Sequence, residues 1–178
     1  MFLEKLNFLF VENEYFQNNE GCISSVSFRY NYLNNVPAGV LLLTSLKELV
    51  LSGNNITYVS DLYRGLTQLE ILDLSSNQIT SVPGEIWPYM YTLKDLYLSG
   101  NKIDHASLSR ISYCTSLEVL VVKDNDIQYI PTTWKDLTRI RVLDLTSNKI
   151  SVVPYCIIRS LTNLKTINLS TNNLTQLP

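Results

Sequence analysis

The chain carries one eleven-residue pattern seven times in tandem, and no other feature of the sequence restricts its fold as strongly. Typical copies read LKELVLSGNNI, LEILDLSSNQI and LKDLYLSGNKI. Each copy begins with an apolar residue, and the seven starting residues are Ile23, Leu46, Leu69, Leu93, Leu117, Ile140 and Leu164. Successive copies therefore start 23 or 24 residues apart. A unit of this length cannot bury its own apolar face, so the pattern predicts a solenoid of stacked coils.

Within each copy, apolar residues at the fourth and sixth positions predict a short strand with one buried face, as at Leu49 and Leu51. A strand this short is not stable alone, and stacking the copies in parallel gives each strand neighbours for its backbone groups. The roughly dozen residues between copies are enough for the crossover that parallel strands require.

The crossovers share a second pattern, in which an apolar residue is followed by proline in most copies. These pairs are Val36-Pro37, Val82-Pro83, Ile130-Pro131, Val153-Pro154 and Leu177-Pro178. Apolar pairs at helical spacing follow and predict short helices or 3₁₀ turns that pack on the sheet, at Leu62/Leu66, Ile86/Met90, Trp134/Leu137 and Ile157/Leu161. The segment DHASLSRISYCTSL, residues 104–117, is predicted to be the most helical crossover.

An asparagine occupies the ninth position of all seven copies, at Asn31, Asn54, Asn77, Asn101, Asn125, Asn148 and Asn172. The chain turns inward after each strand and leaves backbone groups that the sheet cannot satisfy. An amide has donors and an acceptor, so it can bond backbone groups of its own turn and of the next one. We predict a structural asparagine ladder rather than a catalytic role.

This frame resembles the leucine-rich repeat family, and the resemblance covers residues 23–178. It implies an α/β fold, a right-handed curved solenoid with a parallel sheet on the concave face and short helices or 3₁₀ turns on the convex face. The crossovers are similar to those of the intracellular Ras-pathway scaffold and plant Ras-group subclass. The family resemblance also implies a module that binds proteins and has no catalysis of its own.

The two ends are interpreted separately from residues 23–178, which form the seven repeats. Residues 1–22 predict an N-terminal cap or a degenerate repeat, in which Leu6 and Phe8 form a strand within Leu3–Val11. A short amphipathic cap helix is the alternative. The last coil carries no polar cap, so we expect the chain to be part of a longer protein.

Composition excludes several classes of function. A net charge of −2 without a run of Lys or Arg favours neither nucleic acid nor an anionic membrane as partner. No apolar span of 18 residues exists, and no signal-peptide pattern is found. Three scattered cysteines and one histidine, His105, build no metal site. We therefore expect a cytoplasmic protein without cofactor, metal or active site.

The outward positions of the strands are the remaining candidate site, because they form columns along the concave face. Apolar residues with neighbouring acids suggest a protein-binding hot spot; β-propensity alone is the alternative explanation for the valines. The predicted partner-binding residues are Val50, Ile71, Asp73, Asp95, Tyr97, Val119, Val121, Lys123, Val142 and Asp144. Lys123 is predicted to be an unpaired basic contact.

These features predict an intracellular signalling scaffold that binds another protein on its concave face. The alternative is a secreted or cell-surface recognition module of a longer receptor. Triplets typical of N-glycosylation at Asn55, Asn168 and Asn173 would then be occupied.

Overall fold

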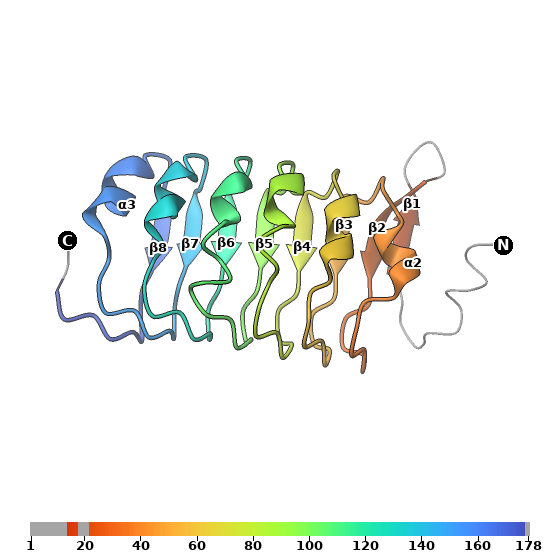
Figure 1. The fold of residues 1–178 in the computed structure, drawn as a ribbon, viewed down its shortest axis with the longest axis horizontal. Helices are drawn as coiled ribbons and strands as arrows, with labels where there is room; N and C mark the ends of the chain where they lie inside the picture. Colours follow the sequence, from red (N-terminus) through yellow and green to blue (C-terminus); the bar gives the residue numbers. More distant parts are fainter. Residues whose placement is uncertain (1–13, 18–21, 177–178) are drawn as a thin grey trace.

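The computed structural model describes residues 14–17 and 22–176, which form a solenoid with two layers. One layer is a single sheet of eight strands in chain order, and the other contains the crossovers (Figure 1). The strands are β1 (Glu14–Gln17), β2 (Ile23–Ser27), β3 (Glu48–Val50), β4 (Ile71–Asp73), β5 (Asp95–Tyr97), β6 (Val119–Val121), β7 (Val142–Asp144) and β8 (Thr166–Asn168).

Strands β2 to β8 are parallel and pair in the register that the repeat predicts. Residues at the fourth position of each copy face one another in a continuous row, made of Val26, Leu49, Leu72, Leu96, Leu120, Leu143 and Ile167. The row lies in the core between the two layers, together with the sixth-position residues. The prediction of a parallel sheet with alternate faces is confirmed.

The N-terminal edge of the sheet differs from the rest, because β1 pairs with β2 in antiparallel fashion. Glu14 lies opposite Ser27, and Phe16 opposite Ser25. The added strand gives hydrogen-bond partners to the edge of β2, which would otherwise be open. The strand predicted within Leu3–Val11 lies outside the described residues, and the assignment of residues 1–22 stays a prediction.

The crossovers contain short helical segments, as the sequence predicts. They are α2 (Ala38–Leu41), η1 (Asp61–Gly65), η2 (Trp87–Tyr89), η3 (Ile111–Tyr113), η4 (Thr132–Asp136) and α3 (Tyr155–Ser160). Pro37, Pro131 and Pro154 each directly precede the first helical residue, where a fixed φ favours helix initiation. Ser60 caps the start of η1 in a different way: its hydroxyl accepts a hydrogen bond of 3.2 Å from the Leu62 N–H.

Two details of the crossover prediction are wrong. Leu62 is 48% exposed, and Tyr63 points into the core in its place. In a 3₁₀ turn residues three apart share a face, so Tyr63 and Leu66 face inward, whereas the predicted Leu62/Leu66 pair has a spacing of four. Residues 104–117 are not the most helical crossover, since they contain only the short η3 after a series of turns. Asp104 starts these turns by accepting from the Ser107 N–H at 3.0 Å, which closes a loop instead of opening a helix.

The asparagines form a ladder that joins each coil to the one before it. Asn101 illustrates the pattern: its amide nitrogen donates to the Leu98 carbonyl of its own turn at 2.9 Å and to the Leu74 carbonyl of the preceding turn at 3.0 Å. Its side-chain oxygen accepts from the Ile79 N–H, also in the preceding turn, at 2.9 Å. The same three bonds recur at Asn54, Asn77, Asn125, Asn148 and Asn172.

The sequence interpretation was wrong about which turns each amide joins. It predicted hydrogen bonds to the asparagine's own turn and to the following turn. The amides instead reach back, because the free N–H of each inward turn lies two residues after its own asparagine and faces the following coil. Asn31 in the first copy is only partly buried, and its amide donates to the Arg29 carbonyl at 3.1 Å. It is the natural comparison for the inner members of the ladder.

The turn between strand and ladder requires a left-handed residue in every copy. The eighth position has positive φ throughout, at Tyr30, Gly53, Ser76, Gly100, Asp124, Ser147 and Thr171. Glycine adopts this conformation freely, whereas the other residues do so at a cost. The ladder amides stabilise the turn that requires this positive φ.

Leu96→Ala is expected to lower the free energy of unfolding by about 2–5 kcal/mol, because the Leu96 side chain is fully buried in the core. Tyr97→Ala is the matched control, since the Tyr97 side chain, next to Leu96 in sequence, is only partly buried on the open face of the sheet. It is expected to cost far less in denaturant titrations. Equal losses would mean that the strand register is shifted by one residue.

Asn125→Ala is expected to destabilise the protein by about 2 kcal/mol, because it leaves the buried Ile103 N–H without a partner. It also removes one of the two amide donors to the Leu98 carbonyl and to the Val122 carbonyl, which keep those of Asn101 and Asn148. Among the described residues, the Asn31 side chain makes one exposed hydrogen bond, and Asn31→Ala is expected to cost much less. Urea unfolding followed by circular dichroism measures both. A loss for Asn31→Ala as large as for Asn125→Ala would contradict the role given to the inner ladder.

Tyr63→Phe is expected to raise the free energy of unfolding by about 1 kcal/mol. The Tyr63 side chain is 0% exposed, and its hydroxyl has no hydrogen-bond partner among the described residues. Burial raises the pKa of this phenol, so the group is buried as a neutral hydroxyl. A loss of stability in the same unfolding assay would show that the hydroxyl is hydrogen-bonded in solution.

Candidate protein-binding surface

The candidate surface is the outer face of the sheet, where residues at the third and fifth positions of each copy form two adjacent columns. The strand register places Asp95 between Ile71 and Val119 in the first column. It places Tyr97 between Asp73 and Val121 in the second. Neighbouring strands lie about 4.8 Å apart, so side chains in one column contact one another.

Four of the predicted residues form an unbroken apolar patch on strands β5 to β7. Tyr97 is paired in register with Val121, and Val119 with Val142. All four side chains are partly exposed. We call Tyr97, Val119, Val121 and Val142 the central patch. Ile71 is also partly exposed, but Asp95 separates it from Val119 in its column.

Val50 does not belong to the accessible surface, and its predicted role as a contact is wrong. Its side chain is only 3% exposed. The Arg29 guanidinium of the first copy lies 3.6 Å from the Asp73 carboxylate of the third copy. Since Ser27, Val50 and Asp73 are in register, this long side chain passes over the second copy and shields it.

Two of the predicted acids are engaged within their own repeats. The Asp73 carboxylate accepts from the Ser75 N–H at 2.9 Å. The Asp144 carboxylate accepts from the Thr146 N–H at 2.9 Å and from its hydroxyl at 2.6 Å. Both acids therefore stabilise the turn after their strand, and the second carboxylate oxygen of Asp73 faces the Arg29 guanidinium. The motif Asp-Leu-Ser/Thr, present in both copies, is the sequence signal for this role.

Tyr97 and Asp95 have environments that disfavour their charged forms. Burial raises the pKa of Asp95, and the nearby negative charge of Glu118 raises it further. Burial also raises the pKa of Tyr97, with the negative charges of Asp95 and Asp73 adding to the effect. The Tyr97 phenol therefore stays protonated and can donate a hydrogen bond to a partner at the centre of an acidic setting.

Lys123 is exposed as predicted, but it is not unpaired. Its ammonium lies 3.7 Å from the Asp124 carboxylate, in the adjacent left-handed turn position. Such an exposed pair is weak and leaves the ammonium available for a second acceptor.

A column of alternating charges borders the candidate surface, and the sequence analysis missed it. Second-position residues pair across coils: Glu70 contacts Lys47 at 3.3 Å and Lys94 at 2.6 Å, and Glu118 contacts Arg141 at 2.8 Å. The hydrogen bond from Lys94 is the main reason why the pKa of Glu70 is lowered. Sign alternation at one repeat position was the available signal. Over all the repeats this position carries four basic and two acidic residues, namely Lys47, Lys94, Arg141 and Lys165 against Glu70 and Glu118.

The residues around His105 do not form a catalytic arrangement. The His105 ring stacks on the Tyr129 ring, with 3.8 Å between ring centroids and a tilt of 38°. Asp104 accepts from the Ser107 N–H at 3.0 Å and from its hydroxyl at 2.9 Å. The backbone bond from Ser107 is the main reason why the pKa of Asp104 is lowered. Asp104 and Ser107 thus close their own loop, and the histidine is part of an aromatic contact.

Within the part of the chain that the structure describes, no three His, Cys, Asp or Glu side chains come together in a way that could hold a metal ion. Nor does any helix in it have the length and apolar character needed to cross a membrane.

Comparison with solved structures supports the curved solenoid. A leucine-rich repeat protein from Leptospira interrogans superposes with a TM-score of 0.77 and 30% identity over 82% of this chain and 36% of that one. The Arabidopsis thaliana receptor kinase ectodomain GASSHO1/SCHENGEN3, solved in complex with CASPARIAN STRIP INTEGRITY FACTOR 2, gives a TM-score of 0.72 at 28% identity. In that case, 79% of this chain and 17% of the ectodomain are covered.

Sequence comparison gives the same family. The flightless-1 homologue of Caenorhabditis elegans is 33% identical over 114 residues, which are 63% of this chain and 9% of that protein. The chain therefore spans only a small part of this relative. A family model described as leucine rich repeat matches residues 67–127 and 91–150, and a model of two leucine-rich repeat copies matches residues 44–89. The repeat frame, the solenoid and these matches show that the chain belongs to the leucine-rich repeat family.

Proposed function

We propose that this protein is an intracellular signalling scaffold that binds another protein on the concave face of its sheet. The observation that carries the proposal is the central patch of Tyr97, Val119, Val121 and Val142. An apolar patch with a protonated tyrosine hydroxyl and adjacent acids has the composition of an interface hot spot. A partner with an apolar anchor and a basic or acceptor group nearby would complement it.

The family comparison supports binding of a protein as the type of activity. The Arabidopsis ectodomain was solved in complex with a named factor, which shows that a solenoid of this kind can hold a partner. The concave face here is an open sheet of parallel strands, which presents the central patch to a partner.

The cysteines support a cytoplasmic location. Cys114 and Cys156 are free thiols, and burial raises the pKa of Cys114 to about 12. The Cys114 thiol is therefore unreactive and contributes to the core as a small apolar side chain. Free thiols without a disulfide among the described residues are typical of a reducing compartment.

A cell-surface recognition module is the second candidate, and it too has a specific observation in its favour. Asn55 and Asn173, which begin two of the glycosylation triplets, are exposed. Asn168, which begins the third, uses its side-chain oxygen to accept from the Ser170 N–H at 3.1 Å. Enzymatic deglycosylation of the native protein distinguishes the two candidates, since a mass shift would favour the surface module.

A pull-down from the source cells tests the concave face directly. The bait is compared with a Tyr97→Ala/Val121→Glu double variant, which removes the aromatic anchor and introduces a charge into the central patch. Quantitative mass spectrometry is expected to show at least one protein retained by the wild type and depleted about tenfold or more by the variant.

The control for this experiment is Tyr155→Ala, which removes an exposed tyrosine on α3, among the crossovers. It is expected to retain the same partner as the wild type. If the double variant retains every partner, the concave face is not the binding site. Circular dichroism of all three proteins verifies that the solenoid is intact.

A further inference from the structure

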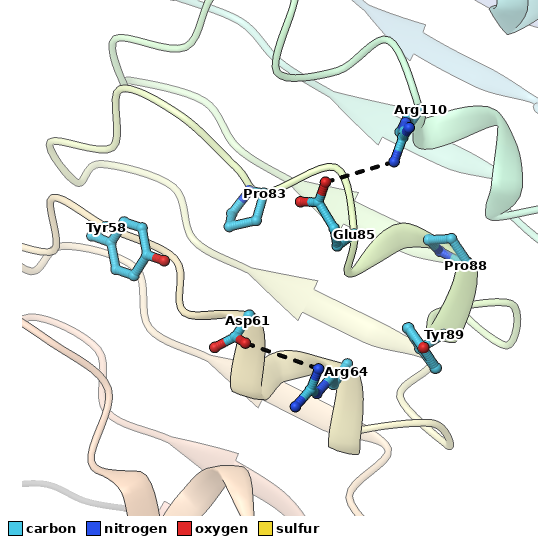
Figure 2. A pocket seen from close by; sticks show the side chains of 8 residues that line it. All are labelled: Tyr58, Asp61, Arg64, Pro83, Glu85, Pro88, Tyr89 and Arg110. Carbon is cyan, nitrogen blue, oxygen red and sulfur yellow. Dashed lines mark ion pairs between the residues drawn. The ribbon is translucent and has the colours of Figure 1, made fainter.

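A surface hollow lies among the crossovers, apart from the concave face of the sheet. It is bounded by η1 of the second copy and by the segment leading into η2 of the third copy (Figure 2). Its volume is about 620 Å³, which is within the range of about 300–1,000 Å³ typical of ligand sites. The family frame does not predict it, because none of its lining residues occupies one of the eleven frame positions.

The apolar part of the hollow is built from two tyrosines and two prolines. Tyr58 and Tyr89 are 52% and 47% exposed, and Figure 2 shows them at opposite ends of the set. Pro83 and Pro88 belong to the wall that leads into and through η2. Tyrosine and proline rings have few internal degrees of freedom, so they offer contact area at a small cost in conformational entropy.

The polar part of the hollow carries balanced charges. Arg64 lies 4.0 Å from Asp61 on one wall, and Arg110 lies 3.7 Å from Glu85 on the other (Figure 2). A guanidinium has five N–H donors, and one carboxylate uses only some of them. With the two phenol hydroxyls, the hollow therefore offers many donors, while its two carboxylates form only weak, exposed pairs with the arginines.

Arg110 reaches the hollow from the fourth copy because of a glycine. A Cβ atom at Gly84 would lie 2.9 Å from Cδ of the Arg110 side chain. Glycine therefore allows the arginine to lie across the third copy and meet Glu85 there. The donor on this wall depends on that close approach.

These features fit one kind of ligand. A polyproline II segment has no internal hydrogen bonds, so its carbonyls are free acceptors, and its prolines have no N–H that would need an acceptor. Its ring faces pack on aromatic side chains. We infer that the hollow lined by Tyr58, Tyr89, Arg64 and Arg110 binds an uncharged, proline-rich peptide segment of another protein.

A neighbouring hollow extends this site. It has a volume of about 250 Å³, shares Arg64, and lies between α2 and η1. Leu42 and Leu62 line it, and both are exposed. A proline-rich segment longer than the first hollow would therefore meet an apolar surface beyond Arg64.

Fluorescence anisotropy with a fluorescein-labelled decaproline peptide tests the inference on the full chain. We expect saturable binding with a dissociation constant below about 1 mM. Tyr58→Ala/Tyr89→Ala is expected to weaken binding about tenfold or more. Gly84→Ala, which displaces Arg110, is expected to weaken binding while leaving both tyrosines in place.

Tyr155→Ala, which removes an exposed tyrosine on α3, is the matched control and is expected to bind decaproline as the wild type does. The inference is overturned if decaproline shows no saturation, or if the Tyr58/Tyr89 variant binds like the wild type. Equal binding of a Gly-Ser peptide of the same length would also overturn it. So would inorganic phosphate shifting the Arg64 and Arg110 NMR signals while decaproline does not, which would indicate an anion site.

Discussion

The rest of the structure depends on the hydrogen bonds that each inner ladder asparagine makes to two adjacent coils. Strands of three residues, such as β3 to β8, give little stability on their own. One amide, as at Asn101, satisfies a buried N–H that the inward turn would otherwise leave without a partner, and it shares each of two carbonyls with a neighbouring ladder asparagine. It also fixes the distance and rotation between coils, so the sheet register follows from the ladder.

This arrangement separates the buried and the exposed residues of each strand. Leucines at the fourth and sixth positions meet in the core, and their neighbours at the third and fifth positions remain on the open face. The outward columns are therefore free to vary without loss of the fold. The central patch around Tyr97 lies in these columns, where side chains contribute little to the core.

The crossovers have different lengths and different helical types, from the six-residue α3 to the three-residue η2 and η3. The hollow lined by residues of η1 and η2 lies among these unequal crossovers. The protein thus has a regular face, set by the repeat, and an irregular face, set by individual segments.

The sequence by itself determined the register, the inward leucines and the position of the ladder, because these are properties of a period repeated seven times. It also indicated the central patch, since alternation along a strand specifies which side chains face outward. Tertiary structure alone decided the burial of Val50 beneath the Arg29–Asp73 pair, because a long side chain crossing two coils follows no local period. The exchange of Leu62 for Tyr63 in the core and the approach of Arg110 to Gly84 have the same origin. They depend on how one particular crossover lies against the next, and periodicity does not encode that.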